Sequence, residues 1–166
     1  MNKLLDLLSQ DARISNSEIA VMLGISEDEV KEKIALYEDT GVIKGYKAII
    51  DKNKAHISTT SAIIEITVQP KFIHGFDELA EKISNFEEVE SIYLMSGGFD
   101  FAVMVTDKSF EEVAKFVANR LAPLDGVIST ATHFILKKYK EQGVQFAELN
   151  GDDRGNISLW LITMIF

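Results

Sequence analysis

The chain has 166 residues, a length that fits one ordinary domain or two small ones. Hydrophobic residues make up 46% of it, which is enough for a packed core and excludes a fully disordered chain. It contains no cysteine, so disulfides and thiolate metal sites are excluded. The formal net charge of −9 argues against a protein that binds nucleic acid through bulk electrostatics alone.

Neither end of the sequence is typical of a secretion signal or a membrane span. Residues 1–6 lack a basic lead followed by an uninterrupted apolar run. Residues 157–166 are apolar, but a bilayer span needs roughly 20 such residues. We therefore expect a cytoplasmic protein without a membrane segment. Its C-terminal tail, residues 151–166, is expected to add a strand or to pack against a neighbour.

The first fifty residues show the pattern of three helices. Leucines within residues 2–10 have the spacing of an amphipathic helix. Ser15 with Glu18, and Ser26 with Glu29, have the spacing of a capping box. In such a box the hydroxyl accepts from the backbone N–H three residues on, and the carboxylate accepts from the backbone N–H of the serine. We expect a second helix to follow Ser15 and a longer third helix to follow Ser26.

A short turn that contains glycine joins the second and third helices. Gly24 ends the second helix, because glycine takes the left-handed conformation there without steric cost, and Gly41 ends the third. Two helices joined by such a turn form a helix-turn-helix unit. Residues 42–50 are then expected to form an extended hairpin arm, or wing, and the polar residues 51–59 a linker. The sequence thus predicts a winged helix-turn-helix domain over residues 1–50.

The remainder alternates between the periods of strands and helices. Strand patterns occur at residues 64–68, 89–95, 99–105 and 127–139, and helix patterns at residues 76–83 and 110–121. The order β-α-β-β-α-β is that of a ferredoxin-like domain built from two split βαβ units. Right-handed crossovers place both helices on one face of the sheet and leave the other face open for a partner. We expect an α+β protein in which this domain covers residues 60–150.

Five motifs in the chain are similar to those of one known family. They are residues 11–16, residues 23–26, residues 41–46, residues 96–101, and residues 124–127 followed by Thr130 and Thr132. Together they resemble the Lrp/AsnC family, the leucine-responsive and asparagine-sensing bacterial regulators. The resemblance runs from about residue 3 to about residue 150 without obvious gaps.

The resemblance implies a homodimer, often assembled into larger rings such as an octamer, that binds promoter DNA and responds to an amino acid or a related small molecule. It places this effector between sensor domains, near the turn at residues 96–98. Backbone N–H groups of a glycine-rich turn can hold a carboxylate, and Asp100 can take the ammonium of the same ligand. Gly98 replaces a polar or charged residue common in the family, which leaves open a different ligand or an empty site. The candidate effector-binding residues are Ser96, Gly97, Gly98, Asp100, Thr130 and Thr132.

The helix expected to read DNA is acidic at the end that enters the major groove. Residues 27–33 contain four carboxylates and two lysines, and Ala35 and Leu36 stand where relatives often carry basic residues. Two accounts are open. Lys31 and Lys33 can pair with carboxylates four residues earlier on a solvated helix, or they can reach phosphate or guanine while a carboxylate accepts from cytosine N4. The candidate DNA-binding residues are Ser26, Lys31, Lys33, Lys44 and Lys47.

Two other functions stay open. Sirohaem decarboxylases share this layout and bind their tetrapyrrole through histidine-containing motifs, but here His56, His74 and His133 are scattered along the chain. The sequence shows no Ser/His/Asp set, phosphate-cradling loop or metal-ligand spacing, so we expect no catalytic residue, metal site or cofactor. The second alternative is an amino-acid-sensing module that no longer binds DNA, which the acidic helix favours.

Overall fold

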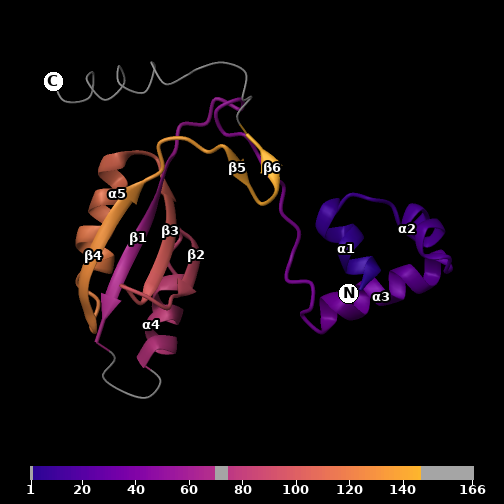
Figure 1. Cartoon of the computed structure of the whole chain (residues 1–166), viewed down its shortest axis with the longest axis horizontal. Helices are drawn as coiled ribbons and strands as arrows, with labels where there is room; N and C mark the ends of the chain where they lie inside the picture. Colours follow the sequence, from indigo (N-terminus) through magenta and orange to yellow (C-terminus); the bar gives the residue numbers. More distant parts are fainter. Residues whose placement is uncertain (1, 70–74, 147–166) are drawn as a thin grey trace. The chain divides into compact units, whose positions relative to one another are not determined.

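A computed structural model describes residues 2–69 and 75–146 of the chain, which form two compact units (Figure 1). The first unit is Met1–Ile49 and the second is Ile50–Phe166. Helices build the first unit, whereas the second combines an antiparallel sheet with helices. Within the described ranges, none of the helices combines the length and apolar character needed to cross a membrane.

Three helices pack around a small apolar core in the first unit, as the sequence predicts. They are α1 (Lys3–Gln10), α2 (Asn16–Leu23) and α3 (Glu27–Asp39). Leu4 of α1, Ile19 and Ala20 of α2, and Val30 of α3 form the core, and each is at most 8% exposed. Every helix therefore contributes a buried side chain, and the relative placement of α2 and α3 follows from this shared core.

Both capping boxes predicted in this unit are present. The Ser15 hydroxyl accepts from the backbone N–H of Glu18, and the backbone N–H of Ser15 donates to the Glu18 carboxylate. The hydrogen bond from the Ser15 hydroxyl, followed by that from its backbone, lowers the pKa of Glu18. Ser26 and Glu29 make the same exchange at the start of α3. Gly24, with φ of 67°, ends α2 in the left-handed region.

The prediction of a hairpin wing is wrong, because residues 42–50 contain no strand and form no hairpin. The backbone N–H of Ile43 donates to the carbonyl of Tyr37 at 2.9 Å, and the Tyr46 hydroxyl donates to the Glu38 carboxylate at 2.9 Å. Partial burial and the Glu38 carboxylate raise the pKa of Tyr46. A lone two-stranded hairpin is marginal in water, and these bonds tie the segment to α3 instead.

Four strands of the second unit form one antiparallel sheet. They are β1 (Thr60–Val68), β2 (Val89–Leu94), β3 (Phe101–Asp107) and β4 (Val127–Phe134). Their order in the sheet is β2-β3-β1-β4, and neighbouring strands are antiparallel. This is the ferredoxin-like order, since each crossover passes over one intervening strand, and it confirms the predicted fold class.

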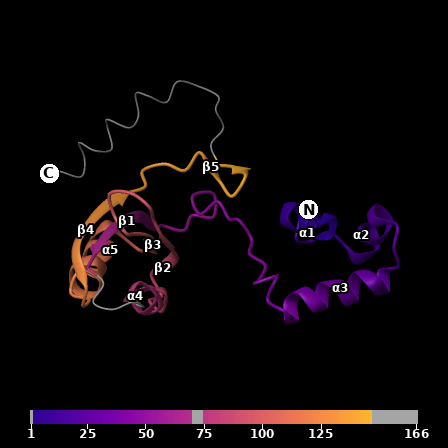
Figure 2. The same ribbon diagram turned by 60° about the horizontal axis from the view of Figure 1, so that its bottom comes forward.

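Both crossover helices cover the same face of this sheet (Figures 1 and 2). They are α4 (Gly75–Ser84) and α5 (Phe110–Phe116), the latter continued by a π-helical turn, η1 (Val117–Leu121). In that turn the backbone N–H of Ala122 donates to the carbonyl of Val117, five residues earlier. The core between helices and sheet takes alternate residues of the two central strands, Ala62, Ile64, Ile66 and Val68 from β1 and Phe101, Val103 and Val105 from β3.

The other side chains of the strands form a second surface, here named the open face. Ser61 is buried at 9% exposure, but the other members are at least partly exposed; Ile63, for example, is 37% exposed and Tyr93 58% exposed. Glu65 and His133 lie side by side on it, with 3.4 Å between Oε1 and Nε2. The cross-strand register defines the open face as Tyr93, Ala102, Glu65 and Ala131 in one row and Ser91, Met104, Ile63 and His133 in the next.

The last strand is shorter than the sequence pattern predicts, since β4 ends at Phe134 rather than at Tyr139. The neighbouring strand β1 begins at Thr60, so the backbone of the residues after Ile135 has no strand to pair with. The chain instead turns into a small hairpin of β5 (Lys140–Glu141) and β6 (Val144–Gln145). The strand or packing segment predicted for residues 151–166 lies outside the described residues.

Candidate functional site

One side of α3 faces solvent and is here named the reading face. Val30 of this helix is buried, and Ile34 and Tyr37 are half-buried against the core. The side turned away from the core bears Asp28, Lys31, Glu32, Ala35, Leu36 and Asp39, all exposed. Because the second helix of a helix-turn-helix unit enters the major groove, the reading face is the surface that would meet base edges.

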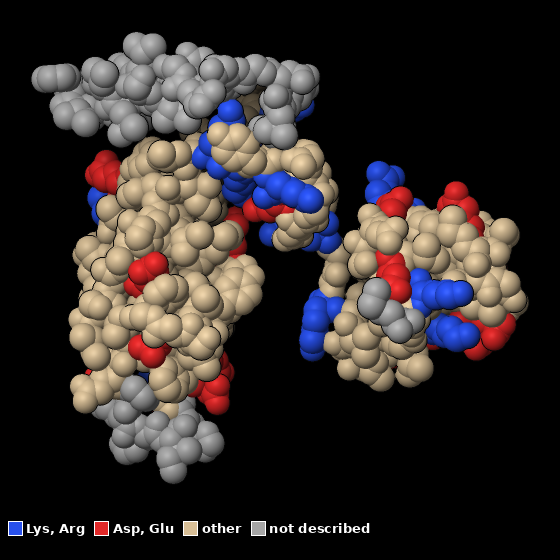
Figure 3. All heavy atoms as spheres, viewed as in Figure 1, with Lys and Arg blue, Asp and Glu red and all other residues tan. Residues whose placement is uncertain are grey.

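The lysines of α3 are paired with carboxylates of the same helix. Lys31 Nζ lies 3.1 Å from Glu27 Oε1 and 3.6 Å from Asp28 Oδ1, and Lys33 Nζ lies 3.7 Å from Glu29 Oε1. The hydrogen bond with Glu27 and the charge of that carboxylate raise the pKa of Lys31. Blue and red side chains accordingly lie intermixed on the first unit in Figure 3. Ion pairs between solvent-exposed side chains of one helix are weak, so a phosphate can replace the carboxylate at small cost.

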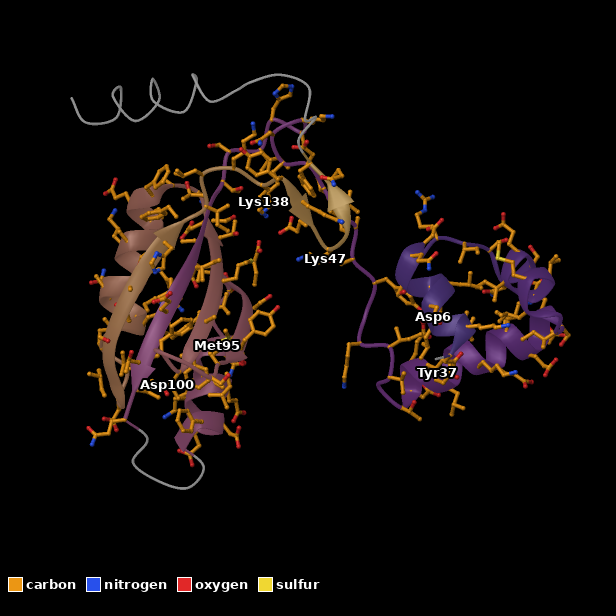
Figure 4. The ribbon with its side chains drawn as sticks, in the orientation of Figure 1. Asp6, Tyr37, Lys47, Met95, Asp100 and Lys138 are labelled. Atoms are coloured by element: carbon orange, nitrogen blue, oxygen red, sulfur yellow. The ribbon has the colours of Figure 1, made fainter. Side chains whose placement is uncertain are left out.

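The other predicted DNA-binding residues lie at the two ends of α3. The Ser26 hydroxyl accepts from the backbone N–H of Glu29, so it has a structural role as the N-cap. Lys44 and Lys47 are exposed on the segment after α3, on either side of Tyr46 (Lys47 is labelled in Figure 4). The bond from Tyr46 to α3 restrains this segment and keeps both lysines near the end of the helix.

The turn at residues 96–98 joins β2 to β3 and is exposed. It is closed by a hydrogen bond of 2.8 Å from the backbone N–H of Met95 to the carbonyl of Asp100, two residues labelled in Figure 4. Gly97 has φ of 151°, a conformation that residues with a side chain rarely adopt. A Cβ atom at Gly98 would meet nothing within 4 Å, so this glycine leaves open space beside the turn.

Asp100 is held in the sheet by its own hydrogen bonds. Its carboxylate Oδ2 accepts from the backbone N–H of Val68 at 2.8 Å, and its backbone N–H donates to the carbonyl of Ile66 at 3.0 Å. The carboxylate thus satisfies a backbone donor at the end of β1, where the β1–β4 register shifts. Sequence reasoning missed this structural role, because nothing in the sequence indicates which backbone N–H lies opposite residue 100.

Thr130 and Thr132 do not lie on the open face. They pair with Ile66 and Ile64 across β1 and β4, and residues directly opposite each other share a face of a sheet. Both threonines are half-buried and point to the side covered by the helices. Strand β1 separates them from β3, a backbone distance of roughly 10 Å. Within one chain the structure places the threonines and Asp100 toward the same end of the sheet but does not bring their side chains together.

The described histidines do not form a metal centre. His56 lies in a turn within the linker, with φ of 56°, and His133 faces Glu65 on the open face. His74 lies outside the described residues. In the parts of the chain that the structure describes, no three His, Asp or Glu side chains are grouped as metal ligands would be.

A cavity of about 230 Å³ opens where the linker meets the sheet. Its walls are residues 50–53, Thr59, Ser61, residues 135–138 and Phe146. It lies at the start of β1, whereas Asp100 contacts the end of that strand, roughly 20 Å away. Figure 4 shows the labelled Lys138 and Asp100 toward opposite ends of the sheet. The sequence predicts only a polar linker at residues 51–59, and the cavity exists because this segment folds against the end of β4.

A helix-turn-helix unit followed by a separate ferredoxin-like domain, together with the matches to known families, defines the class of the protein, a transcriptional regulator with a sensor domain. Residues 2–36 match the AsnC-type helix-turn-helix domain, and residues 61–145 match the Lrp/AsnC ligand binding domain. The chain belongs to the Lrp/AsnC family.

Known relatives extend over nearly the whole chain. The HTH-type transcriptional regulator YugG of Bacillus subtilis is 46% identical over 154 residues, 92% of this chain and 92% of that protein. The regulator LrpA of Pyrococcus abyssi is 34% identical over 137 residues, 82% of this chain and 94% of that protein. Among solved structures, the feast or famine regulatory protein of M. tuberculosis complexed with L-methionine has a TM-score of 0.69 and 27% identity, covering 83% of this chain and 90% of that one.

The contact between Asp100 and Val68 yields a first prediction. Replacing Asp100 with Ala leaves the partly buried backbone N–H of Val68 without its acceptor, so we expect the free energy of unfolding to fall by about 1–3 kcal/mol. In Asp100→Asn the amide oxygen still accepts from Val68, and stability should stay within about 0.5 kcal/mol of the wild type. Urea unfolding at one fixed protein concentration measures both variants. Equal stability of the alanine and asparagine variants would contradict the structural role of this carboxylate.

Proposed function

We propose that this regulator binds duplex DNA through the reading face of α3 and changes its DNA affinity when the second unit binds an amino acid. The observation that supports the first half is the exposure of that face on the second helix of a capped helix-turn-helix unit. The names of the relatives support the regulatory role. In this proposal the protein acts in the cytoplasm and catalyses no reaction.

The charges of the first unit set the expected strength of DNA binding. Carboxylates of α3 form ion pairs with its lysines, so we expect few favourable phosphate contacts from the helix itself. The exposed Lys44 and Lys47 supply them from the adjoining segment. Since contacts between cations and phosphates release counterions, binding is expected to be weak and strongly dependent on salt.

Removing these two lysines tests the phosphate contacts. In Lys44→Ala/Lys47→Ala we expect weaker binding to all duplexes, and a slope of log K against log salt that is smaller in magnitude by about 2. Fluorescence anisotropy across a series of salt concentrations measures it. Lys115→Ala is the matched control, because Lys115 is an exposed lysine on α5 of the second unit that pairs with Glu111. An unchanged slope in the double variant would exclude phosphate contacts by this segment.

For the effector we propose a site at the turn of residues 96–98, with Asp100 as the group that takes an ammonium. The open space beside Gly98 and the exposed turn support it, as does the L-methionine complex of the M. tuberculosis relative. Thr130 and Thr132 line the helix side of the same end of the sheet. An effector bound here alters DNA affinity only if it binds two arrangements of the protein with different affinity.

Asp100→Asn separates the proposed ligand role from the structural one. The amide keeps the acceptor for Val68 but loses the charge that would hold an ammonium group. We screen the common amino acids by thermal shift on the wild type; an effector at 100 times its Kd should add about 2.7 kcal/mol of stability. The variant should fold normally and lose this gain. A variant that responds like the wild type would remove Asp100 from the site.

We further propose that the open face pairs with a second copy of the chain in a closed two-fold dimer, from which larger rings such as an octamer are built. Its half-exposed apolar side chains, among them Ile63, Met104 and Tyr93, need cover from water. A two-fold dimer brings the same surface of both copies together and gives the two α3 helices a common symmetry axis.

A charge on the open face tests this dimer. Ile63→Lys places an ammonium at the centre of the proposed interface, where desolvation costs several kcal/mol, so we expect monomers at micromolar concentration. Light scattering after gel filtration gives the mass in solution. Val21→Lys is the control, since Val21 is 83% exposed on α2 and should tolerate the change. Assembly of the Ile63 variant to the wild-type size would place the interface elsewhere.

A sensor that no longer binds DNA is the second candidate, and the pairing of Lys31 and Lys33 with carboxylates favours it. DNA binding and amino-acid binding measured on one preparation separate the two functions. Retardation of genomic DNA fragments at low salt supports the regulator proposed above. A preparation that binds an amino acid but retards no fragment even at low salt would contradict DNA binding and support the sensor function.

A further inference from the structure

Two residues that are adjacent in sequence, Ala35 and Leu36, place apolar side chains on the otherwise charged reading face. Ala35 and Leu36 are both exposed, and Leu36 is 57% exposed. They follow Lys31 and Glu32 by four residues each, so they lie one turn further along the same side of α3. The backbone at Leu36 is fixed, because its carbonyl accepts from both the backbone N–H and the hydroxyl of Thr40.

The charged side chains of α3 are poorly available to distinguish one base from another, because most of them are paired with each other. Lys31 is shared between Glu27 and Asp28, and Lys33 is paired with Glu29. The carboxylates around Lys31 are repelled by the phosphates that flank the groove. A favourable contact with the floor of the groove therefore has to include the uncharged part of the reading face.

Thymine is the base that offers an apolar group there. On the major-groove edges of the base pairs, the remaining groups are hydrogen-bond donors and acceptors, whereas the C5-methyl group of thymine accepts apolar contact. A major groove about 12 Å wide admits an α-helix, and the five-residue step from Lys31 to Leu36 advances only about 7.5 Å along its axis. Leu36 can thus lie in the groove together with Lys31.

We propose that Leu36, supported by Ala35, is a specificity-determining residue that packs on a thymine methyl group. The inference rests on the proposed DNA binding by α3 and deepens it: the preferred sites contain a thymine at one fixed position per bound α3 helix. The sequence preference then comes from apolar contact, while Lys44 and Lys47 contribute affinity for any sequence.

Replacing thymine by uracil removes this methyl group and nothing else. Duplexes are first selected from a random library by the full-length protein at low salt. Each thymine of a selected duplex is then replaced by uracil in turn, and Kd is measured by fluorescence anisotropy. At one thymine per half-site we expect the uracil substitution to raise Kd about fourfold, which corresponds to the free energy of burying one methyl group. The other thymines should change Kd by less than about twofold.

Two variants show whether Leu36 reads the methyl group. In Leu36→Ala the thymine and uracil duplexes should bind equally, and because the side chain is exposed the variant should fold normally. Val21→Ala removes an exposed apolar side chain from α2 and should keep the fourfold ratio. Circular dichroism verifies that both variants are folded.

The outcomes separate a failure of the role proposed for Leu36 from a failure of the proposed DNA binding by α3. If the wild type selects no duplex, the proposed DNA binding fails. If it binds duplexes but no uracil substitution changes Kd, or if Leu36→Ala still discriminates between thymine and uracil, DNA binding stands and the role of Leu36 is overturned.

Discussion

The structure of the second unit depends on the burial of one face of strands β1 and β3. Alternate residues of these central strands are at most 7% exposed, and both crossover helices lie against them. Because side chains of a strand alternate between two faces, burying one set leaves the other set on the open face. The same register directs Thr130 and Thr132 toward the helices and places the turn of residues 96–98 at one end of the sheet.

In the first unit, local hydrogen bonds and charge act on one helix at the same time. The carboxylates at the start of α3 favour the helix, since they close its capping box and oppose its macrodipole. They also pair with its lysines and so reduce the positive charge available to DNA. The residues that stabilise α3 are therefore the ones that weaken its attraction to phosphate. This conflict makes the uncharged residues Ala35 and Leu36 important for recognition.

Several parts of the fold could be predicted because they depend on neighbours in sequence. The capping boxes at Ser15 and Ser26 need only residues three positions apart, and both formed. The alternation in β1 and β3 predicted the buried face. The prediction of a wing was wrong because a hairpin needs packing that residues 42–50 do not have. The predicted length of β4 was wrong because the neighbouring strand begins at Thr60, so β4 ends at Phe134.

The sequence by itself determined the order of the elements, the buried face of the sheet and the acidic character of α3, because period and capping are local properties. Only the tertiary structure decided the partners of the candidate site residues. In the structure the Asp100 carboxylate accepts a hydrogen bond from the backbone N–H of Val68, Thr130 and Thr132 point toward the helices, and the linker lines a cavity. These outcomes depend on strand register and on which backbone groups lack a partner, and both are set by contacts between residues far apart in sequence.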